Sequence, residues 1–443
     1  MRRDPAQHVA RALAWGFLAA PEWTDRDLVA SAVTTLGYRY RWMKRVVRPV
    51  MATYHRPPVD RPEALSRFVL THTPLRQALA DQAHRGAPTR VRQLALAPAS
   101  MGRQRWPVPP IEDLASLADL LDLPLEQLGW AADTRGLQRR APPGPLHLYR
   151  HQWVQRPGAV PRLLESPTPL LRAVLRRVLQ EILVWVPVHP AAHGFVRGRS
   201  AVTNATAHLG ASTVLCLDLQ TFFATITANR VNGIFRSMGY PASVAWTLTA
   251  LCTHQTPVHV LSEIPTGGDS SQRYLLRSRL RSRHLPQGAA TSPALANLAC
   301  FGLDQRLARY AAAAGLTYTR YADDLTFSGP QCSAQRLVSA ASAIVREEGF
   351  ALNTAKTRVR GPHQRHEVTG VVVNERPNVP REYYDQLRAV LHDAHIHGVD
   401  AANRDGHPDF RRHLDGRIGW VESLNAGRGA RLRAQYDAVI WPI

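Results

Sequence analysis

The sequence predicts an α+β fold, in which helical segments flank a region that mixes helices with an antiparallel pair of strands. Residues 1 to about 140 contain amphipathic helices separated by proline-containing turns. The β-branched run "STVLCLDL", residues 212–219, fits a buried strand. The run "GLTYTRYADDLTFSG", residues 315–329, predicts two strands around a tight turn.

The first residues predict a helix and not a signal peptide. His8 and Arg11 interrupt the apolar run, and Val9, Leu13 and Phe17 follow helical spacing. The later segment "IEDLASLADLLDLPLEQLGWAAD", residues 111–133, predicts two packed helices, the second opened by a proline. The role of residues 1–140 stays open, because this region carries no chemical motif.

Helices and loops alternate through the rest of the chain. "RRAPPGP", residues 139–145, predicts a linker, and residues 170–186 predict a basic amphipathic helix. "SEIPTGGDSSQRY", residues 262–274, predicts a polar surface loop, and residues 333–350 predict another helix. After Pro380 the sequence predicts a basic, mostly helical segment.

The charge balance points to a polyanionic partner. The 443 residues include 55 Lys and Arg against 34 Asp and Glu, a formal net charge of +21, and phosphate groups are the natural counterpart of such an excess. An Arg-rich composition from a GC-rich genome is the competing explanation. A chain of this length predicts more than one domain.

Two negative features bound the location of the protein. The four cysteines lie far apart without metal-ligand spacing, which predicts free thiols in a reducing cytosol; they are Cys216, Cys252, Cys300 and Cys332. No uninterrupted apolar run of about 18 residues is found, so we expect no transmembrane span.

Three acidic residues suggest a metal site. Asp323 and Asp324 stand next to each other in an apolar run, where a divalent cation would relieve their repulsion. Asp218 directly follows the apolar run Val214 to Leu217, and the carbonyl of Leu219 could complete a metal shell. Oxygen-only ligands suit Mg²⁺, and two ions would support phosphoryl transfer. Taken singly, an Asp-Asp pair is more often a solvated turn.

A third segment strengthens this reading. In "LPQGAATSPALANL", residues 285–298, the small residues around Gly288 would let a helix start lie close to a nucleotide or template. Gln287 offers an amide for hydrogen bonding. A capped helix beginning near Ser292 and Pro293 would satisfy the same pattern without any function.

The order of these motifs resembles the reverse transcriptases. Asp218 with Phe222-Phe223, then the LPQG segment, then Tyr321-Ala-Asp-Asp, look like their palm motifs. More narrowly, Asn204-Ala-x-x-His208 and Val368-Thr-Gly370 resemble blocks of the bacterial retron reverse transcriptases. The resemblance covers residues 146 to 443. It implies a right-hand polymerase architecture: fingers and palm over 146–375, a helical thumb over 376–443 and a helical N-terminal extension over 1–140.

The resemblance also implies residue roles. The catalytic and metal-binding residues are Asp218, Asp323 and Asp324, with Leu219 as a further metal ligand, for two Mg²⁺ ions that Mn²⁺ could replace. The residues that bind the incoming nucleotide are Arg162, Phe223 as steric gate, Gln287, Gly288 and Lys356. The residues that contact primer or RNA are Tyr321, Asn204, His208, Val368, Thr369 and Gly370. Taken alone, Phe223 is more often a core aromatic and Arg162 or Lys356 a solvated surface residue.

Two departures from the family pattern stand out. The fingers pattern with a Lys appears here as "VQRPG", residues 154–158, where Arg156 could substitute. Ala290 stands where relatives have proline, which we expect to loosen the turn without removing a functional group. Neither change touches a predicted metal ligand.

The implied function is RNA-directed DNA synthesis in the bacterial cytoplasm. A retron-like enzyme would use a cognate structured non-coding RNA as template and primer and dNTPs as substrates. Its DNA product would be branched RNA–DNA (msDNA), made in antiphage defence beside a separate effector protein. The alternatives are a group II intron-type reverse transcriptase or maturase, a non-retron defence reverse transcriptase, and a non-catalytic RNA-binding scaffold. Intron boundaries beside the gene would favour the maturase, whereas an upstream inverted-repeat locus would favour the retron.

Overall fold

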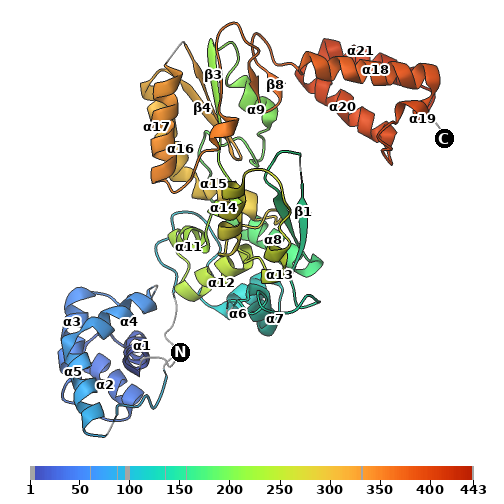
Figure 1. Cartoon of the computed structure of the whole chain (residues 1–443). Helices are drawn as coiled ribbons and strands as arrows, with labels where there is room; N and C mark the ends of the chain where they lie inside the picture. The colour runs from blue at the N-terminus through green and yellow to red at the C-terminus, as the bar shows by residue number, and fades with distance from the viewer. Residues whose placement is uncertain are drawn as a thin grey trace. The chain divides into compact units, whose positions relative to one another are not determined.

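The computed structural model describes residues 5–59, 61–86, 88–94, 100–134, 136–155, 157–330 and 333–441. The chain forms two compact units. Figure 1 shows its helices and strands with their labels. The first unit comprises Met1–Val186 and Thr227–Ser292, and the second comprises Pro187–Ile226 and Pro293–Ile443. The three-part division into extension, fingers with palm, and thumb stays a prediction.

Five N-terminal helices pack around one apolar cluster of the first unit. They are α1 (Pro5–Leu18), α2 (Asp25–Leu36), α3 (Met43–Thr53), α4 (Pro62–Thr71) and α5 (Thr73–His84). Val9, Leu13 and Phe17 are buried in this cluster, so the predicted amphipathic helix is confirmed. Thr24 accepts a hydrogen bond from the Asp27 N–H and caps α2.

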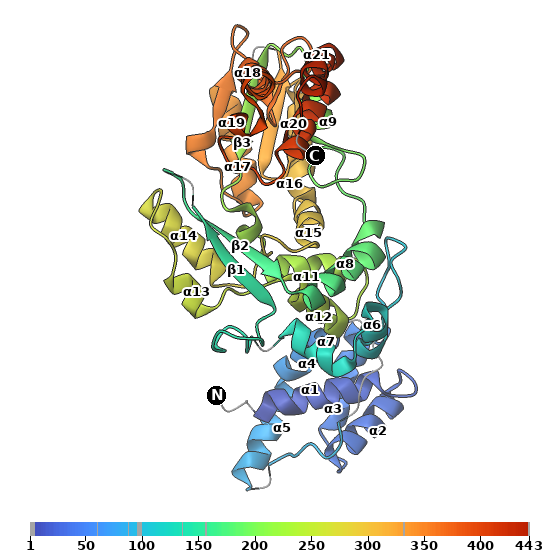
Figure 2. The ribbon, with the colours of Figure 1, turned by 90° about the vertical axis from the view of Figure 1, so that its right-hand side faces the viewer.

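The rest of the first unit combines a β-hairpin with short helices. Strands β1 (Tyr149–Val154) and β2 (Arg162–Pro167) pair antiparallel and lie side by side in Figure 2. The helices of this part are α6 (Leu114–Leu121), α7 (Leu125–Ala132), α8 (Pro169–Arg177), α11 (Ala228–Ser237), α12 (Ala242–Cys252), α13 (Val258–Ser262) and α14 (Ser270–Leu280). Helix α8 continues as a π turn and a 3₁₀ turn to Trp185, which confirms most of the helix predicted over 170–186.

One loop prediction is wrong in part. The segment 262–274 was expected to be a surface loop, but α14 begins inside it at Ser270. The Asp269 carboxylate accepts a hydrogen bond from the Gln272 N–H, and this cap starts the helix. The polar residues that suggested a loop are those that cap and begin the exposed helix α14.

The second unit is built on a four-stranded antiparallel sheet. The strands lie in the order β4 (Thr317–Tyr321), β5 (Asp324–Gly329), β3 (Thr213–Asp218) and β6 (Arg358–Arg360). The predicted strand 212–219 and the predicted hairpin 315–329 are therefore both confirmed. Leu215, Leu217 and Leu325 are almost fully buried, as the apolar runs required.

Helices cover both faces of this sheet. Helix α16 (Phe301–Ala313) lies on one face, where Asp304 accepts a hydrogen bond from the Tyr318 hydroxyl; α17 (Ala334–Glu347) packs beside it. Helix α9 (Ala201–Thr206) lies on the other face, where Asn204 accepts a hydrogen bond from Thr319. The hairpin β7 (Glu367–Val368) and β8 (Val371–Val372) contacts α9. The short α10 (Phe222–Thr225) follows β3, and α15 (Ser292–Ala299) begins at the serine predicted to start it.

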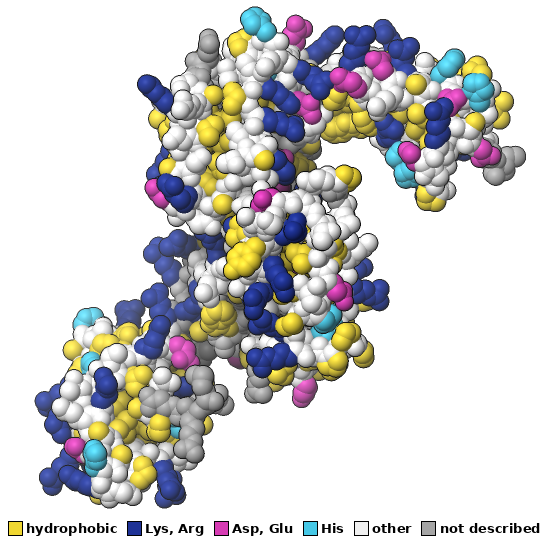
Figure 3. Space-filling model, in the orientation of Figure 1, with side chains coloured by type: hydrophobic (Ala, Val, Ile, Leu, Met, Phe, Trp, Pro, Cys, Tyr) yellow, Lys and Arg dark blue, Asp and Glu magenta, His cyan; other side chains and the backbone are white. Residues whose placement is uncertain are grey.

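The C-terminal part is helical and basic, as predicted. It contains α18 (Arg381–His397), α19 (Val399–Ala402), α20 (Phe410–Leu424) and α21 (Ala426–Asp437). Figure 3 shows many Lys and Arg side chains on these helices, with Asp and Glu among them. Tyr384 is buried in their apolar cluster, whereas Tyr383 lies under the Arg417 guanidinium.

The predicted fold class is confirmed at the level of mixed helices and antiparallel sheets with helices at the N-terminal end. Cys216, Cys252 and Cys300 form no disulfide, and Cys332 lies outside the described residues. Within the described ranges, no helix has the length and apolar character needed to cross a bilayer.

Candidate active site

The sheet of the second unit brings the predicted carboxylates together. Asp218 at the end of β3 pairs directly with Asp324 at the start of β5. Directly opposed residues of an antiparallel pair point to the same face, with Cα atoms about 4.5–5.5 Å apart. The Leu219 N–H donates to the Asp323 carbonyl at 2.9 Å, so the end of β3 is also fixed to the turn. Asp218 and Asp324, 106 positions apart in the sequence, thus lie at the same end of the sheet.

The turn that carries Asp323 has an unusual backbone. Tyr321 pairs with Asp324, which leaves Ala322 and Asp323 as a two-residue turn. Ala322 has φ 57°, in the left-handed region that non-glycine residues seldom occupy. Gly194 lies directly against this turn, because a Cβ atom there would meet the Ala322 nitrogen at 2.5 Å.

A buried ion pair lies beneath the turn. Arg320 is fully buried and pairs with Asp304 through two hydrogen bonds, of 2.8 and 2.7 Å. The same guanidinium donates to the Asn297 side chain and to the Ala322 carbonyl, each at 3.0 Å. The Arg320 guanidinium thus fixes the carbonyl of Ala322, the residue with positive φ, and this contact orients Asp323 and Asp324, which follow it.

The negative charges of the carboxylates repel one another, and nearby cations offset part of this repulsion. Partial burial, with the charges of Asp323 and Asp218, raises the pKa of Asp324 to about 6. The Lys356 ammonium lies 2.8 Å from an Asp218 carboxylate oxygen. Lys356 ends a short 3₁₀ turn (Thr354–Lys356) and is half exposed. The site thus places its carboxylates beside Lys356 and Arg358, and both cations partly offset the rise in the pKa of Asp324.

The carboxylates open onto a cavity of about 230 Å³. Its lining includes Asp218, Asp324, Lys356, Thr369 and Gly370. A carboxyl whose pKa is raised by burial and by its like-charged neighbours fits the binding of a hard divalent cation such as Mg²⁺ or Mn²⁺. That Asp218, Asp323 and Asp324 together hold such ions stays a prediction.

Aromatic side chains lie next to the carboxylates. The Phe195 ring lies 6.3 Å from that of Phe223 and 6.5 Å from that of Tyr321, centre to centre. Phe223 follows the left-handed residue Thr221 and is only partly buried, unlike Phe222. Its exposed part allows the proposed contact with a nucleotide sugar, which stays a prediction.

The other predicted nucleotide-binding residues belong to the first unit. Arg162 begins β2 and is exposed. The Gln287 carbonyl accepts a hydrogen bond from the Glu165 N–H at 2.9 Å. A Cβ at Gly288, which has φ 138°, would meet the Glu165 carbonyl oxygen at 2.8 Å, so only glycine fits here. The backbone of β2 at Glu165 is therefore in direct contact with the LPQG segment. Arg156, the residue that could replace the missing fingers lysine, lies outside the described residues.

Comparison with known proteins identifies the family. Residues 158–373 match the family of reverse transcriptases (RNA-dependent DNA polymerases). Retron Mx65 reverse transcriptase of Myxococcus xanthus is 43% identical over 287 residues, which cover 63% of this chain and 61% of that protein. Retron Ec86 reverse transcriptase of Escherichia coli is 36% identical over 250 residues, which cover 55% of this chain and 69% of that protein. The chain belongs to the retron reverse transcriptases.

A further relative shows the same extent of similarity. Retron Mx162 reverse transcriptase of Myxococcus xanthus is 38% identical over 299 residues, which cover 64% of this chain and 59% of that protein. The chain thus spans about three fifths of the length of its two Myxococcus relatives. The family predicted from the motifs is confirmed, and the chain carries a reverse transcriptase domain.

In this retron reverse transcriptase, Asn204 and His208 are buried behind the sheet. The His208 ring nitrogens bond to the Ser328 and Thr319 hydroxyls, each at 2.7 Å. Burial lowers the pKa of His208 to about 4, so its ring is neutral at physiological pH. These contacts fasten α9 to β4 and β5. Direct contact of the two side chains with primer or RNA stays a prediction.

The Val-Thr-Gly block forms a tight turn. Val368 pairs with Val371, and the intervening Thr369 and Gly370 have φ of 49° and 79°. Positive φ at both central residues is typical of a two-residue hairpin of type I′. Val368 is buried, whereas Thr369 and Gly370 line the carboxylate cavity. Their proposed contact with nucleic acid stays a prediction.

Sequence reasoning missed two features of the retron reverse transcriptase site. Phe195 is exposed, has φ 61° and contacts both Phe223 and Tyr321. Its position in "HGFVRG" between glycines was the available signal. The Arg320–Asp304 pair was not predicted either, because the two residues lie on different elements and carry no motif of their own.

Proposed function

We propose that this chain is an RNA-directed DNA polymerase of the retron type. The observation that carries the proposal is the pairing of Asp218 with Asp324 across β3 and β5, with Asp323 in the adjoining turn. All three lie within the region that matches the reverse transcriptases. Such a group of acidic residues beside a cavity suits metal-assisted nucleotidyl transfer.

The right-hand architecture is part of the proposal. The four-stranded sheet would be the palm, and α18–α21 would be the thumb. The β1–β2 hairpin with the helices that follow it would be part of the fingers, and α1–α7, within residues 1–140, would form an extension whose role is open. Family membership and the mixed fold support this assignment.

The residues divide the chemistry among them. Asp218, Asp323 and Asp324, with the Leu219 carbonyl, would hold two Mg²⁺ ions, for which Mn²⁺ could substitute. Bound there, the ions would lower the pKa of the attacking 3′-hydroxyl and stabilise the charge of the leaving pyrophosphate. Lys356 would neutralise further charge on the pyrophosphate, and the Phe223 ring would leave no room for a 2′-hydroxyl. Arg162, Gln287 and Gly288 would bind the incoming nucleotide, and Tyr321 would support the primer end.

The substrate and product follow from the family. We propose a structured non-coding RNA as template and primer, dNTPs as substrates and branched RNA–DNA (msDNA) as product. The net charge of +21 supports binding to a nucleic-acid backbone. The setting we propose is antiphage defence in the bacterial cytoplasm, together with a separate effector protein.

The product tests this function in cells. The gene and its flanking DNA are expressed with either the wild-type sequence or Asp218→Asn, and small nucleic acids are extracted. We expect a short DNA that shifts in size after RNase treatment, present only with the wild-type protein. The same DNA in Asp218→Asn cells, or its absence from both, would contradict the proposal. Sequencing it would identify the template RNA, and a phage plaque assay with the same pair of strains would test the defence role.

A further inference from the structure

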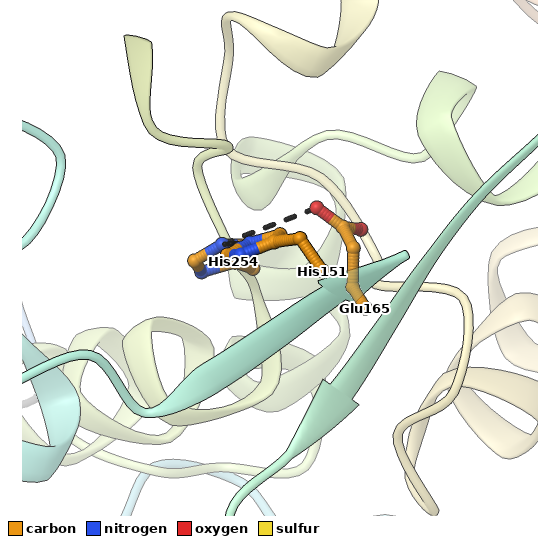
Figure 4. Close-up of side chains that lie close together, drawn as sticks. All are labelled: His151, Glu165 and His254. Atoms are coloured by element: carbon orange, nitrogen blue, oxygen red, sulfur yellow. Dashed lines mark hydrogen bonds and ion pairs between the residues drawn. The ribbon is translucent and has the colours of Figure 1, made fainter. Parts of the chain in front are cut away.

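A cluster of histidines and one glutamate lies in the first unit, apart from the residues proposed for polymerisation. His151 comes from β1, Glu165 from β2 and His254 from the segment after α12. One nitrogen or oxygen of each residue lies within 4.8 Å of those of the other two. Figure 4 shows the two imidazole rings next to each other, with the carboxylate of Glu165 close to His254. Among the described residues, this is the one group of three His, Cys, Asp or Glu side chains found at this spacing.

The distances suit a small metal ion. The Nε2 atoms of His151 and His254 are 3.0 Å apart, and His254 Nε2 is 4.0 Å from Glu165 Oε1. Ligand atoms bonded to one zinc ion at about 2.0–2.2 Å lie about 3.3–3.6 Å from one another. Small side-chain rotations would therefore bring the three atoms to coordination distance.

A hydrogen bond joins the two rings in the absence of an ion. The 3.0 Å contact between His151 Nε2 and His254 Nε2 requires that one of the two nitrogens carries the shared proton. That ring must move the proton to its Nδ1, or release it, before both Nε2 atoms can bind the same ion.

A second layer of hydrogen bonds fixes the carboxylate. His284 Nε2 lies 3.0 Å from Glu165 Oε2, and the Thr256 hydroxyl donates to Oε1 at 2.9 Å. Both partners are buried. Such outer contacts orient metal-binding carboxylates and are a regular feature of built metal sites.

We propose that His151, Glu165 and His254 form a binding site for a divalent transition-metal ion of the zinc class. Two imidazole nitrogens and one carboxylate oxygen form a donor set that suits Zn²⁺ and neighbouring ions better than Mg²⁺. His151 is only partly buried, which leaves water access for a fourth ligand.

The site would join segments that are distant in the sequence. Glu165 already bonds through its N–H to the Gln287 carbonyl, and His254 and His284 pair through their backbones. An ion would therefore clamp the β1–β2 hairpin to the segments that precede and carry the LPQG motif. This structural role does not depend on DNA synthesis.

Metal binding tests the inference without any nucleotide. The full-length protein carrying Asp323→Asn and Asp324→Asn, which weakens cation binding at the acidic site, is freed of metal and titrated with Zn²⁺ against a chromophoric chelator. We expect one equivalent of Zn²⁺ bound with Kd below about 1 µM. Adding His151→Gln, at the partly exposed position, should weaken binding at least ~10-fold. The control His259→Gln changes a nearby histidine outside the group and should leave Kd unchanged.

Spectroscopy and stability separate this site from adventitious binding. X-ray absorption of the zinc-loaded protein should show imidazole nitrogen neighbours, and zinc should raise Tm in the parent protein and in His259→Gln but not in His151→Gln. No binding, equal binding in His151→Gln, or a zinc shell of oxygens alone would overturn the inference. A failed DNA-synthesis assay would bear on the proposed function alone, because these measurements contain no substrate.

Discussion

At the scale of single residues, Asp324 links the electrostatics of the site to pH. Its pKa of about 6 lies above the ordinary 3.8, so the folded metal-free protein binds this proton more tightly than the unfolded chain. The resulting stabilisation is complete below about pH 3.8 and is lost as the pH rises through about 6. Charged Asp324 therefore destabilises the metal-free fold at neutral pH.

Asp324→Asn should stabilise the metal-free protein at pH 7.5. The substitution removes a charge that Asp218 and Asp323 repel, so we expect Tm to rise by about 2 °C or more at pH 7.5 and by less at pH 5. Calorimetry of both proteins in EDTA measures the difference at each pH, which cancels the titration of groups that are not coupled to Asp324. A lower Tm of the variant at pH 7.5 would contradict the proposed repulsion.

Phe223→Ala should relax the choice between dNTPs and rNTPs. If the ring excludes the 2′-hydroxyl, its loss should lower the ratio of kcat/KM for dNTP to that for rNTP roughly 10- to 200-fold. Phe301→Ala, which removes a half-exposed aromatic from α16, is the matched control. Unchanged rejection of rNTPs in Phe223→Ala would remove the proposed role of this residue.

Site residues could be predicted from the sequence where the type of side chain by itself indicates a chemical role. Asp218, Asp323 and Asp324 were predictable because carboxylates in apolar runs are costly without a cation. The packing of Asn204 and His208 was not, because their partners Thr319 and Ser328 lie more than 100 residues away. Phe195 contacts the site only because the chain folds back on itself at Gly194.

At the scale of elements, the β4–β5 hairpin is held by the buried pair of Arg320 and Asp304. Removing one partner of a buried ion pair leaves an uncompensated charge, which costs about 3–5 kcal/mol. Arg320 also holds the Ala322 carbonyl, so its loss affects both the stability and the shape of the turn.

Two variants separate these effects. Arg320→Met should lower the free energy of unfolding by ~3 kcal/mol or more, and Arg320→Met with Asp304→Asn should recover much of this loss. DNA synthesis should stay low in both variants, because neither restores the contact to Ala322. Chemical denaturation and primer extension measure the two properties. Full recovery of synthesis in the double variant would mean that Arg320 contributes to stability alone.

Elements were predictable where the local pattern decides them. The strand 213–218 and the hairpin 317–329 follow from apolar, β-branched runs around a turn. The β1–β2 hairpin was not predicted, because "PRLLESP" contains prolines and its pairing partner is polar. The sequence predicts a loop for residues 270–274, the start of α14, because they are polar and only the Asp269 cap marks where the helix begins.

At the scale of the whole molecule, the charge of +21 should govern RNA binding. Each phosphate that is neutralised releases counterions, so the logarithm of affinity should fall linearly with the logarithm of salt concentration. For 6–10 contacts we expect a loss of roughly 10³- to 10⁵-fold between 50 and 200 mM salt. Filter binding of the template RNA identified from the cellular DNA product measures the slope over this range, and a flat dependence would contradict backbone binding.

The central claim is that three acidic residues, brought together by β3 and the β4–β5 turn, carry DNA synthesis. The most direct measurement is dNTP incorporation by purified wild-type protein and by Asp323→Asn with Asp324→Asn, on the template RNA identified from the cellular DNA product, with Mg²⁺. Asp400→Asn, an exposed acidic residue on α19, is the matched control. We expect incorporation to fall at least ~10³-fold in the double variant, about 4 kcal/mol of barrier, with RNA binding retained and the control unaffected. Incorporation by the double variant at the wild-type rate would contradict the account.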